Sequence, residues 1–247
     1  MTIYDYQKGK ERTENILDNE LTIVEQDSIP VDSAFTFNNG YYSWTSAIFI
    51  DIRDSSILFA DEDREKVSKL IRSFTSETIE ILRDDDNLRE IGIRGDCVYG
   101  IYTTPQKKDI LALANKTFYV NTFMKMLNIL LKERSLPKIK VGIGMSSAKE
   151  LVVKAGRKDV GINSKVWIGK AVTRASHFSS IGNKMGNPPL VYSTCSYNNF
   201  IDGLKKRNED KDVESWFTYH SDEENGAYYT ANIVKTDFDN WILSGMR

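Results

Sequence analysis

Cysteines are scarce in this chain, and neither sign of charge dominates. Cys97 and Cys195 are the only two cysteines among 247 residues, too few for a disulfide framework and at no spacing typical of a metal site. They predict a reducing compartment. The 33 lysines and arginines nearly balance the 35 aspartates and glutamates, which leaves a formal charge of -2. This balance excludes general affinity for polyanions, so we expect no nucleic-acid partner.

Long hydrophobic runs are also missing. No apolar stretch approaches the ~20 residues of a membrane span, and residues 1–20 lack the hydrophobic segment of a secretion signal. We therefore expect a soluble, cytoplasmic protein that does not bind membranes. With 40% hydrophobic residues, the chain is long enough to bury a core of its own.

The apolar residues that are present alternate between strand-like and helix-like patterns. The run 46–52 predicts a buried strand, and residues 63–83 carry apolar side chains at helical spacing. LREIGIRG and CVYGIYTT predict a hairpin that turns at Gly95, because glycine gives the backbone freedom that a tight turn needs. Residues 108–132 predict a second long helix.

Further short strands follow Pro137. KIKVGIGMSS predicts a strand, LVVKAG its partner and KVWIG a third, before a helix that ends near Gly182. LVYSTCS, a helix over 198–206 and AYYTANIV indicate strands added to the same sheet. The order of elements predicts an α+β fold.

Two aspartates lie at strand ends of this predicted sheet. Asp51 ends the first strand, and Asp96 lies in the turn of the hairpin, so both carboxylates can reach one edge of the sheet. Two converging carboxylates without histidine or cysteine suit Mg²⁺ or Mn²⁺. Such pairs commonly hold two ions that bind a triphosphate. An aspartate at a strand end or in a Gly-Asp turn is also common for purely structural reasons, and that alternative stays open.

The turn after Asp51 reads Arg53-Asp54-Ser55-Ser56. Because it leads into the next helix, its backbone amides could cradle phosphates. We expect Arg53, Ser55 and Ser56 to bind phosphate.

With these parts in order, residues 43–190 resemble the catalytic domain of the class III nucleotidyl cyclases. No single motif is specific, whereas four in the right order are. The resemblance implies a class III cyclase fold, a ferredoxin-like βαββαβ core sheet with helices on one face and added C-terminal strands. Residues 1–42 would then form an N-terminal arm and 191–247 an extension of the same domain. The four matching segments are Phe49-Ile50-Asp51-Ile52, Gly95-Asp96-Cys97-Val98-Tyr99, Val141-Gly142-Ile143-Gly144-Met145-Ser146 and Trp167-Ile168-Gly169-Lys170-Ala171-Val172.

The resemblance also implies a reaction and an assembly. Asp51 and Asp96, with the carbonyl of Ile52, would bind two Mn²⁺ or Mg²⁺ ions per active site. The 3′-hydroxyl of a nucleoside triphosphate would attack its own α-phosphate and expel pyrophosphate. Members of the family work as homodimers with the active sites at the interface.

The sequence departs from the family where the base is recognised. Members that make cyclic AMP carry a lysine four residues before the second metal aspartate, and an aspartate or threonine three before the interfacial glycine. Here these positions are Gly92 and Val166, and neither side chain can read the amino edge of adenine. Arg94 lies on the same strand face as Asp96 and could donate to a carbonyl of the base. An ion pair between Arg94 and a surface acid is the alternative that stays open.

The interfacial helix departs as well. The family has an asparagine and, four residues later, an arginine, where this sequence has Thr173 and His177. Their i, i+4 spacing puts both on one helical face, so they could still orient the ribose and donate to the phosphate. His177 could also be an ordinary surface residue, and Lys170 or Arg174 could supply the missing positive charge.

A small cyclase without the adenine-reading residues resembles the pyrimidine cyclases of bacterial antiphage defence. They make cyclic UMP or cyclic CMP, a second messenger for a separate effector protein. Uracil offers two carbonyl acceptors and cytosine one, so Arg94 as a donor favours UTP over CTP. Two alternatives stay open: a guanylate or adenylate cyclase with an unusual pocket, and a degenerate cyclase domain that only binds a nucleotide.

Overall fold

The computed structural model describes residues 4–55, 63–157 and 160–247. Its strands are β1 (Thr22–Glu25), β2 (Asn39–Ile52), β3 (Leu88–Arg94), β4 (Cys97–Thr103), β5 (Val141–Arg157), β6 (Ile162–Gly169), β7 (Leu190–Ser193), β8 (Phe217–Asp222) and β9 (Gly226–Ala231). Its α-helices are α1 (Tyr6–Leu17), α3 (Arg64–Arg83), α4 (Lys107–Glu133), α5 (Lys170–Ile181), α6 (Thr194–Lys206) and α7 (Thr236–Leu243). Two short 3₁₀ helices are η1 (Asp32–Ala34) and η2 (Glu214–Trp216).

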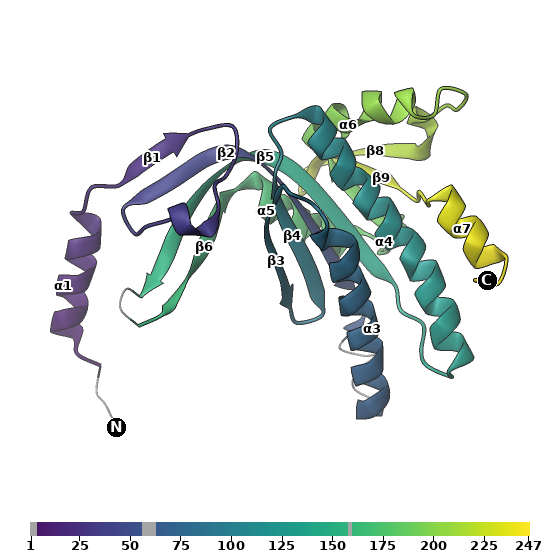
Figure 1. The fold of residues 1–247 in the computed structure, drawn as a ribbon, viewed down its shortest axis with the longest axis horizontal. Helices are drawn as coiled ribbons and strands as arrows, with labels where there is room; N and C mark the ends of the chain where they lie inside the picture. Colours follow the sequence, from purple (N-terminus) through teal and green to yellow (C-terminus); the bar gives the residue numbers. More distant parts are fainter. Residues whose placement is uncertain (1–3, 56–62, 158–159) are drawn as a thin grey trace.

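The described strands form a single mixed sheet in the order β3-β4-β2-β5-β7-β9-β8, with β1 paired to β2 and β6 paired to β5. The long strands β2 and β5 run antiparallel through its centre. Figure 1 shows α3 and α4 side by side over one face of this sheet. The C-terminal strands β8 and β9 extend the same sheet beyond β7. The expected α+β fold is confirmed.

Alternate residues of β2 face two different layers. Ile48, Ile50 and Ile52 are buried in the main core with side chains of α3, α4 and α6. Ala47 and Phe49 belong to a second cluster with Ala175 of α5. Because side chains alternate along a strand, Asp51 shares the α5 face of the sheet. The expectation of helices on one face therefore holds for α3 and α4, whereas α5 covers the opposite face.

Two glycines of β5 let α5 lie directly on the sheet. A Cβ at Gly144 would collide with the backbone carbonyl of Ala175, and a Cβ at Gly142 with that of Ser179. Ile143 lies between these two glycines and Met145 follows Gly144. Both side chains point into the main core instead. The Gly-x-Gly pattern thus positions α5.

The sequence prediction was wrong about one boundary inside this sheet. KIKVGIGMSS and LVVKAG are parts of one continuous strand, β5, and not of two paired strands. LVVKAG pairs with the beginning of β2 and with β6, so β2 already begins at Asn39. The physical reason is that no glycine or proline turn separates the two segments, and the strand bends without ending.

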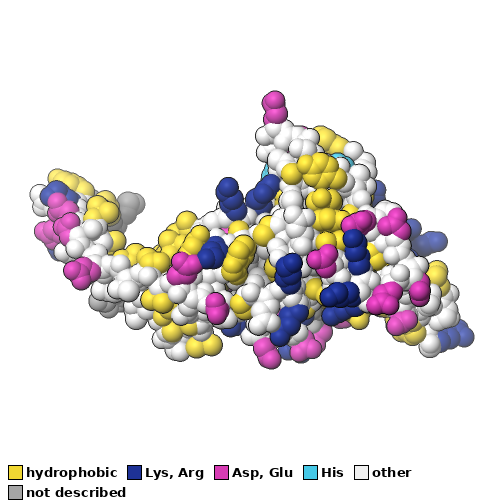
Figure 2. Space-filling model, turned by 90° about the horizontal axis from the view of Figure 1, so that it is seen from above, with side chains coloured by type: hydrophobic (Ala, Val, Ile, Leu, Met, Phe, Trp, Pro, Cys, Tyr) yellow, Lys and Arg dark blue, Asp and Glu magenta, His cyan; other side chains and the backbone are white. Residues whose placement is uncertain are grey.

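The N-terminal helix α1 stands apart from the rest of the molecule (Figure 1). Its only buried residue is Gly9. Figure 2 shows the same helix projecting at one end, and basic and acidic side chains interspersed over the visible face. None of the described helices is long and apolar enough to cross a membrane.

Candidate active site

Asp51 and Asp96 lie at the same edge of the sheet. Asp51, near the end of β2, pairs in register with Cys97, the residue after Asp96. The β3–β4 turn that carries Asp96 depends on Gly95, which adopts a φ of +64°. Burial raises the pKa of Asp51; Arg53 opposes this shift, and the negative charge of Asp96 adds to it. Two like charges therefore converge, an arrangement that a cation would stabilise.

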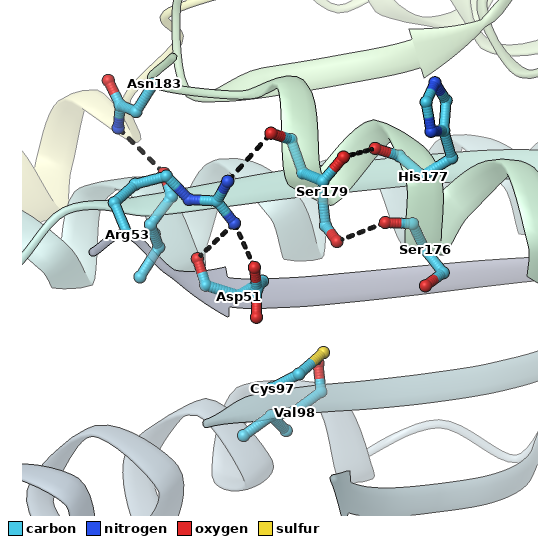
Figure 3. A network of polar contacts seen from close by, with 10 residues as sticks. Asp51, Arg53, Cys97, Val98, Ser176, His177, Ser179 and Asn183 are labelled. Atoms are coloured by element: carbon cyan, nitrogen blue, oxygen red, sulfur yellow. Dashed lines mark hydrogen bonds and ion pairs between the residues drawn. The ribbon is translucent and has the colours of Figure 1, made fainter. Parts of the chain in front are cut away.

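Arg53 supplies such a cation in this structure. Its guanidinium makes an ion pair with the Asp51 carboxylate, donates to the Asp51 carbonyl at 3.3 Å and donates to the Ser180 carbonyl at 2.9 Å. Figure 3 shows Arg53 between Asp51 and the end of α5. Its side chain is only 10% exposed. Arg53, which we predict to bind phosphate, makes an ion pair with the half-buried Asp51 carboxylate in this structure, and its role toward phosphate stays a prediction.

The donor set of this edge fits a hard divalent cation. It consists of two carboxylates with no nitrogen or sulfur ligand, which suits Mg²⁺ or Mn²⁺. Within residues 4–55, 63–157 and 160–247, no cluster of three or more His, Cys, Asp or Glu side chains forms a cage that would hold a metal ion by itself. The remaining ligands would then be water, substrate oxygens and the predicted carbonyl of Ile52, whose side chain points into the core. Ser55 follows this edge along the chain, and Ser56 lies outside the described residues.

An aromatic cluster lies beside Gly92 of β3. A Cβ at Gly92 would come within 2.7 Å of the Tyr99 ring, so glycine is needed for this packing. Tyr99 stacks on Phe49, with ring centroids 5.1 Å apart, and donates to Glu90 at 2.9 Å. The indole of Trp167 donates to the other carboxylate oxygen of Glu90 at 2.8 Å. Burial and the Glu90 hydrogen bond raise the pKa of Tyr99 to about 12, so its phenol keeps its proton.

Glu90, Tyr99 and Trp167 were not among the predicted site residues. One available signal was the hairpin register, because Tyr99 lies directly opposite Gly92. Glycine opposite an aromatic residue in a hairpin indicates a ring that covers the glycine. Trp167 carried no such signal, since it reaches β3 only through the fold of the β5–β6 hairpin.

The three positions assigned to base recognition, Gly92, Arg94 and Val166, do not all lie together. Arg94 is exposed at the end of β3, and its positive charge partly offsets the rise in the pKa of Tyr99. Val166 is 41% exposed and precedes Trp167, so it points to the opposite face of β6. Gly92 and Arg94 thus lie on the strand face of the Tyr99 cluster. From β6, Trp167 and not Val166 contacts this cluster.

Thr173 and His177 lie on the exposed face of α5, as their spacing predicts. The Thr173 hydroxyl donates to the Gly169 carbonyl at 2.8 Å. The imidazole of His177 contacts Asn225 and, in Figure 3, points away from Asp51 and Arg53. Among the described residues of one chain, no hydrogen bond joins Thr173 or His177 to either aspartate. One chain therefore does not assemble the whole predicted site.

Two curated proteins are similar to this chain in sequence. The chain is 51% identical over 243 residues to a uridylate cyclase of Treponema porcinum, covering 98% of this chain and 82% of that protein. It is 28% identical over 248 residues to a uridylate cyclase of Gulbenkiania mobilis, covering 96% and 95% respectively. No family model matches.

A solved structure supports the fold. The adenylyl cyclase CyaB of P. aeruginosa superposes with a TM-score of 0.63 over 80% of this chain and 98% of that one. The two sequences are 17% identical, so this likeness concerns the fold alone.

Proposed function

Because this chain belongs to the class III nucleotidyl cyclases, within the group of the pyrimidine nucleotide cyclases, we propose that it converts UTP, in preference to CTP, to the 3′,5′-cyclic monophosphate and pyrophosphate. The observation that carries the reaction is the convergence of Asp51 and Asp96 at one sheet edge. The choice of UTP is supported by the 51% identity to a uridylate cyclase.

Asp51 and Asp96 would hold two Mn²⁺ or Mg²⁺ ions. When bound, these ions supply the charge that activates the 3′-hydroxyl and stabilises the reacting phosphate. Arg53 keeps Asp51 in place: its guanidinium ties the carboxylate to the Ser180 carbonyl at the end of α5. Together with Ser55, Ser56 and the backbone of the turn, Arg53 would also bind phosphate.

The base would bind beside Arg94 and the cluster of Glu90, Tyr99 and Trp167. Arg94 is exposed and carries donors only, which suits the two carbonyl oxygens of uracil. Gly92 offers no donor to a base and instead accommodates Tyr99. Val166 belongs to a different surface. Val166 is 41% exposed, and Ile93 and Ile168 are exposed as well, at 54% and 50%.

A homodimer would complete each site. Thr173 and His177 of one chain lie away from their own aspartates, so the partner chain would supply these two side chains. The exposed apolar residues Ile93, Val166 and Ile168 are suited to burial in that interface. In the cell, the cyclic pyrimidine nucleotide would serve as a second messenger of antiphage defence that acts on a separate effector protein.

The test is to incubate the purified protein with ATP, GTP, CTP and UTP separately, with Mn²⁺, and to identify the products by mass spectrometry. We expect cyclic UMP as the main product. Asp51→Asn and Asp96→Asn should each lower the rate by about 100-fold or more, because each removes a metal-binding carboxylate. Asp54→Asn is the matched control, since Asp54 is the exposed neighbour in the same turn.

The other outcomes separate the alternatives. Cyclic AMP or cyclic GMP as main product would keep the reaction and overturn the assignment of the base pocket. Equal activity in Asp51→Asn and Asp54→Asn would contradict the two-metal site. No product from any of the four nucleotides would favour a domain that only binds nucleotides.

A further inference from the structure

The turn between β8 and β9 makes hydrogen bonds to the exposed face of α5 through Asn225. The guanidinium of Arg174 donates to the Asn225 carbonyl at 3.0 Å. The Nε2 atom of His177 contacts the side-chain oxygen of Asn225. The C-terminal extension therefore touches two basic side chains on the helix face that carries Thr173.

The side-chain amide of Asn225 has a fixed orientation. Its Nδ2 donates to both carboxylate oxygens of Asp222, at 2.9 and 3.0 Å, and its backbone N–H donates to the same carboxylate at 2.6 Å. These hydrogen bonds hold the pKa of Asp222 below its ordinary value, so the carboxylate stays an acceptor near neutral pH. A flipped amide would place its oxygen against that carboxylate.

The amide orientation determines the hydrogen on His177. Because Nδ2 of Asn225 is used by Asp222, the oxygen Oδ1 faces the imidazole and can only accept. His177 must therefore carry a hydrogen on Nε2, whether the ring is neutral or charged. Its Nδ1 atom is then the ring nitrogen available to a second partner.

Arg174 is restrained from two sides. Its guanidinium lies 5.3 Å from the centre of the Phe178 ring and donates to the Asn225 carbonyl. Gly226, the next residue of the turn, has a φ of +66° and passes close to this guanidinium. The turn thus limits how both basic side chains of α5 can move.

We propose that Asn225 is a positioning residue: it fixes the orientation and the Nε2–H form of His177 and the direction of the Arg174 guanidinium. The proposal rests on the proposed function, in which α5 of one chain completes the site of its partner. The family pattern has an arginine at the position of His177. A shorter imidazole needs external support to present a ring nitrogen to a phosphate; with Nε2–H donated to Asn225, that nitrogen is Nδ1, which donates when the ring is charged.

The test combines imidazole NMR with kinetics on the full chain. His177 and His220 are the only two histidines, so only two sets of ring ¹⁵N shifts need to be assigned. His220 is the internal reference, because it pairs with Thr230 at 2.9 Å and lies outside this contact. The variants are Asn225→Ala and Asp222→Asn, with Glu223→Ala as the matched control in the same exposed turn.

We expect Asn225→Ala to move the ¹⁵N shifts of His177 toward a mixture of tautomers, and those of His220 to stay. The kcat with UTP should fall about tenfold, which corresponds to the loss of one orienting hydrogen bond, while KM changes little. Asp222→Asn should give a smaller change of the same kind, because the amide of Asn225 can then flip. Glu223→Ala should match the wild type in both measurements.

Two results would overturn the proposal: unchanged His177 shifts in Asn225→Ala, or a kcat equal to that of Glu223→Ala. A wild-type protein that forms no cyclic nucleotide would defeat the proposed function instead. In that case the His177 shifts still decide whether Asn225 holds the imidazole.

Discussion

Glu150 shows how a single side chain holds an element in place. It is completely buried in β5 and accepts a hydrogen bond from the backbone N–H of Ala171, at the beginning of α5. A Cβ at Gly169 would come within 2.6 Å of its carboxylate, so the glycine makes room for it. Its second oxygen has no hydrogen-bond partner among the described residues. The carboxyl group thus orients the helix that carries Thr173 and His177.

This carboxyl group should make stability depend on pH. Burial raises the pKa of Glu150 above 4.5, and the amides of Ala171 and Val172 lower it only in part. The folded state therefore retains this proton at pH values where the unfolded state has lost it. As a consequence, its contribution to the free energy of unfolding falls as pH rises from 4.5 through the raised pKa.

Urea denaturation of the wild type and of Glu150→Gln at several pH values measures how the free energy of unfolding depends on pH. We expect the variant to gain stability relative to the wild type as pH rises, because glutamine cannot ionise. Glu150→Ala should lose about 1–3 kcal/mol at every pH, since it leaves the Ala171 N–H unpaired. Parallel pH curves for wild type and Glu150→Gln would show that the carboxyl group is not perturbed.

At the scale of elements, the contact between α5 and β5 decides where the site lies. Gly142 and Gly144 allow the helix backbone to rest on the strand, and Glu150 caps the beginning of the helix from the same strand. The end of the helix reaches Arg53 through the Ser180 carbonyl. Helix α5 is therefore fixed at both ends relative to Asp51.

Gly144→Ala tests this contact. The new Cβ would collide with the backbone of Ala175, which cannot move by a side-chain rotation. We expect a loss of about 2–3 kcal/mol in the free energy of unfolding, measured by urea denaturation, and a loss of cyclase activity.

Gly203→Ala is the control. Gly203 lies within α6, and its new Cβ would meet only the far end of the flexible Leu111 side chain. Helix propensity then favours alanine by about 1 kcal/mol. Equal destabilisation by both substitutions would contradict a special role for the β5–α5 contact.

At the scale of the whole molecule, the residues of the proposed active site fall into two separate halves. One half is the pair of aspartates, and the other is the exposed face of α5. Arg53 and Asp51 face each other, whereas His177 points away from them (Figure 3). If two chains exchange these halves, each site contains the aspartates of one chain and α5 of the other. Symmetric pairing of two copies would satisfy both sites at once.

Mixing two inactive variants tests the exchange. One variant is Asp51→Asn, and the other carries Thr173→Ala with His177→Ala. Random pairing of equal amounts gives heterodimers with one intact site, so we expect about a quarter of wild-type activity. Mixing Asp51→Asn with Asp96→Asn is the control and should restore nothing, because both changes lie in the same half. No recovery in the first mixture would contradict the shared site.

The sequence by itself determined the local features of this protein. Apolar periodicity and turn residues predicted most helices and strands, because both act over a few neighbouring residues. The sequence also predicted Asp51 and Asp96 at one edge of the sheet, because the strands of a βαββ unit are expected to be neighbours, and β2 does pair with β4. The spacing of Thr173 and His177 likewise predicted a shared helix face.

Only the tertiary structure decided which distant side chains meet. Arg53 contacts Asp51 and donates to the Ser180 carbonyl, Trp167 donates to Glu90, and Asn225 contacts His177. The partners in the last three contacts are 127, 77 and 48 residues apart. No local pattern encodes such pairs, because they result from how whole elements pack, down to the two glycines that seat α5 on β5.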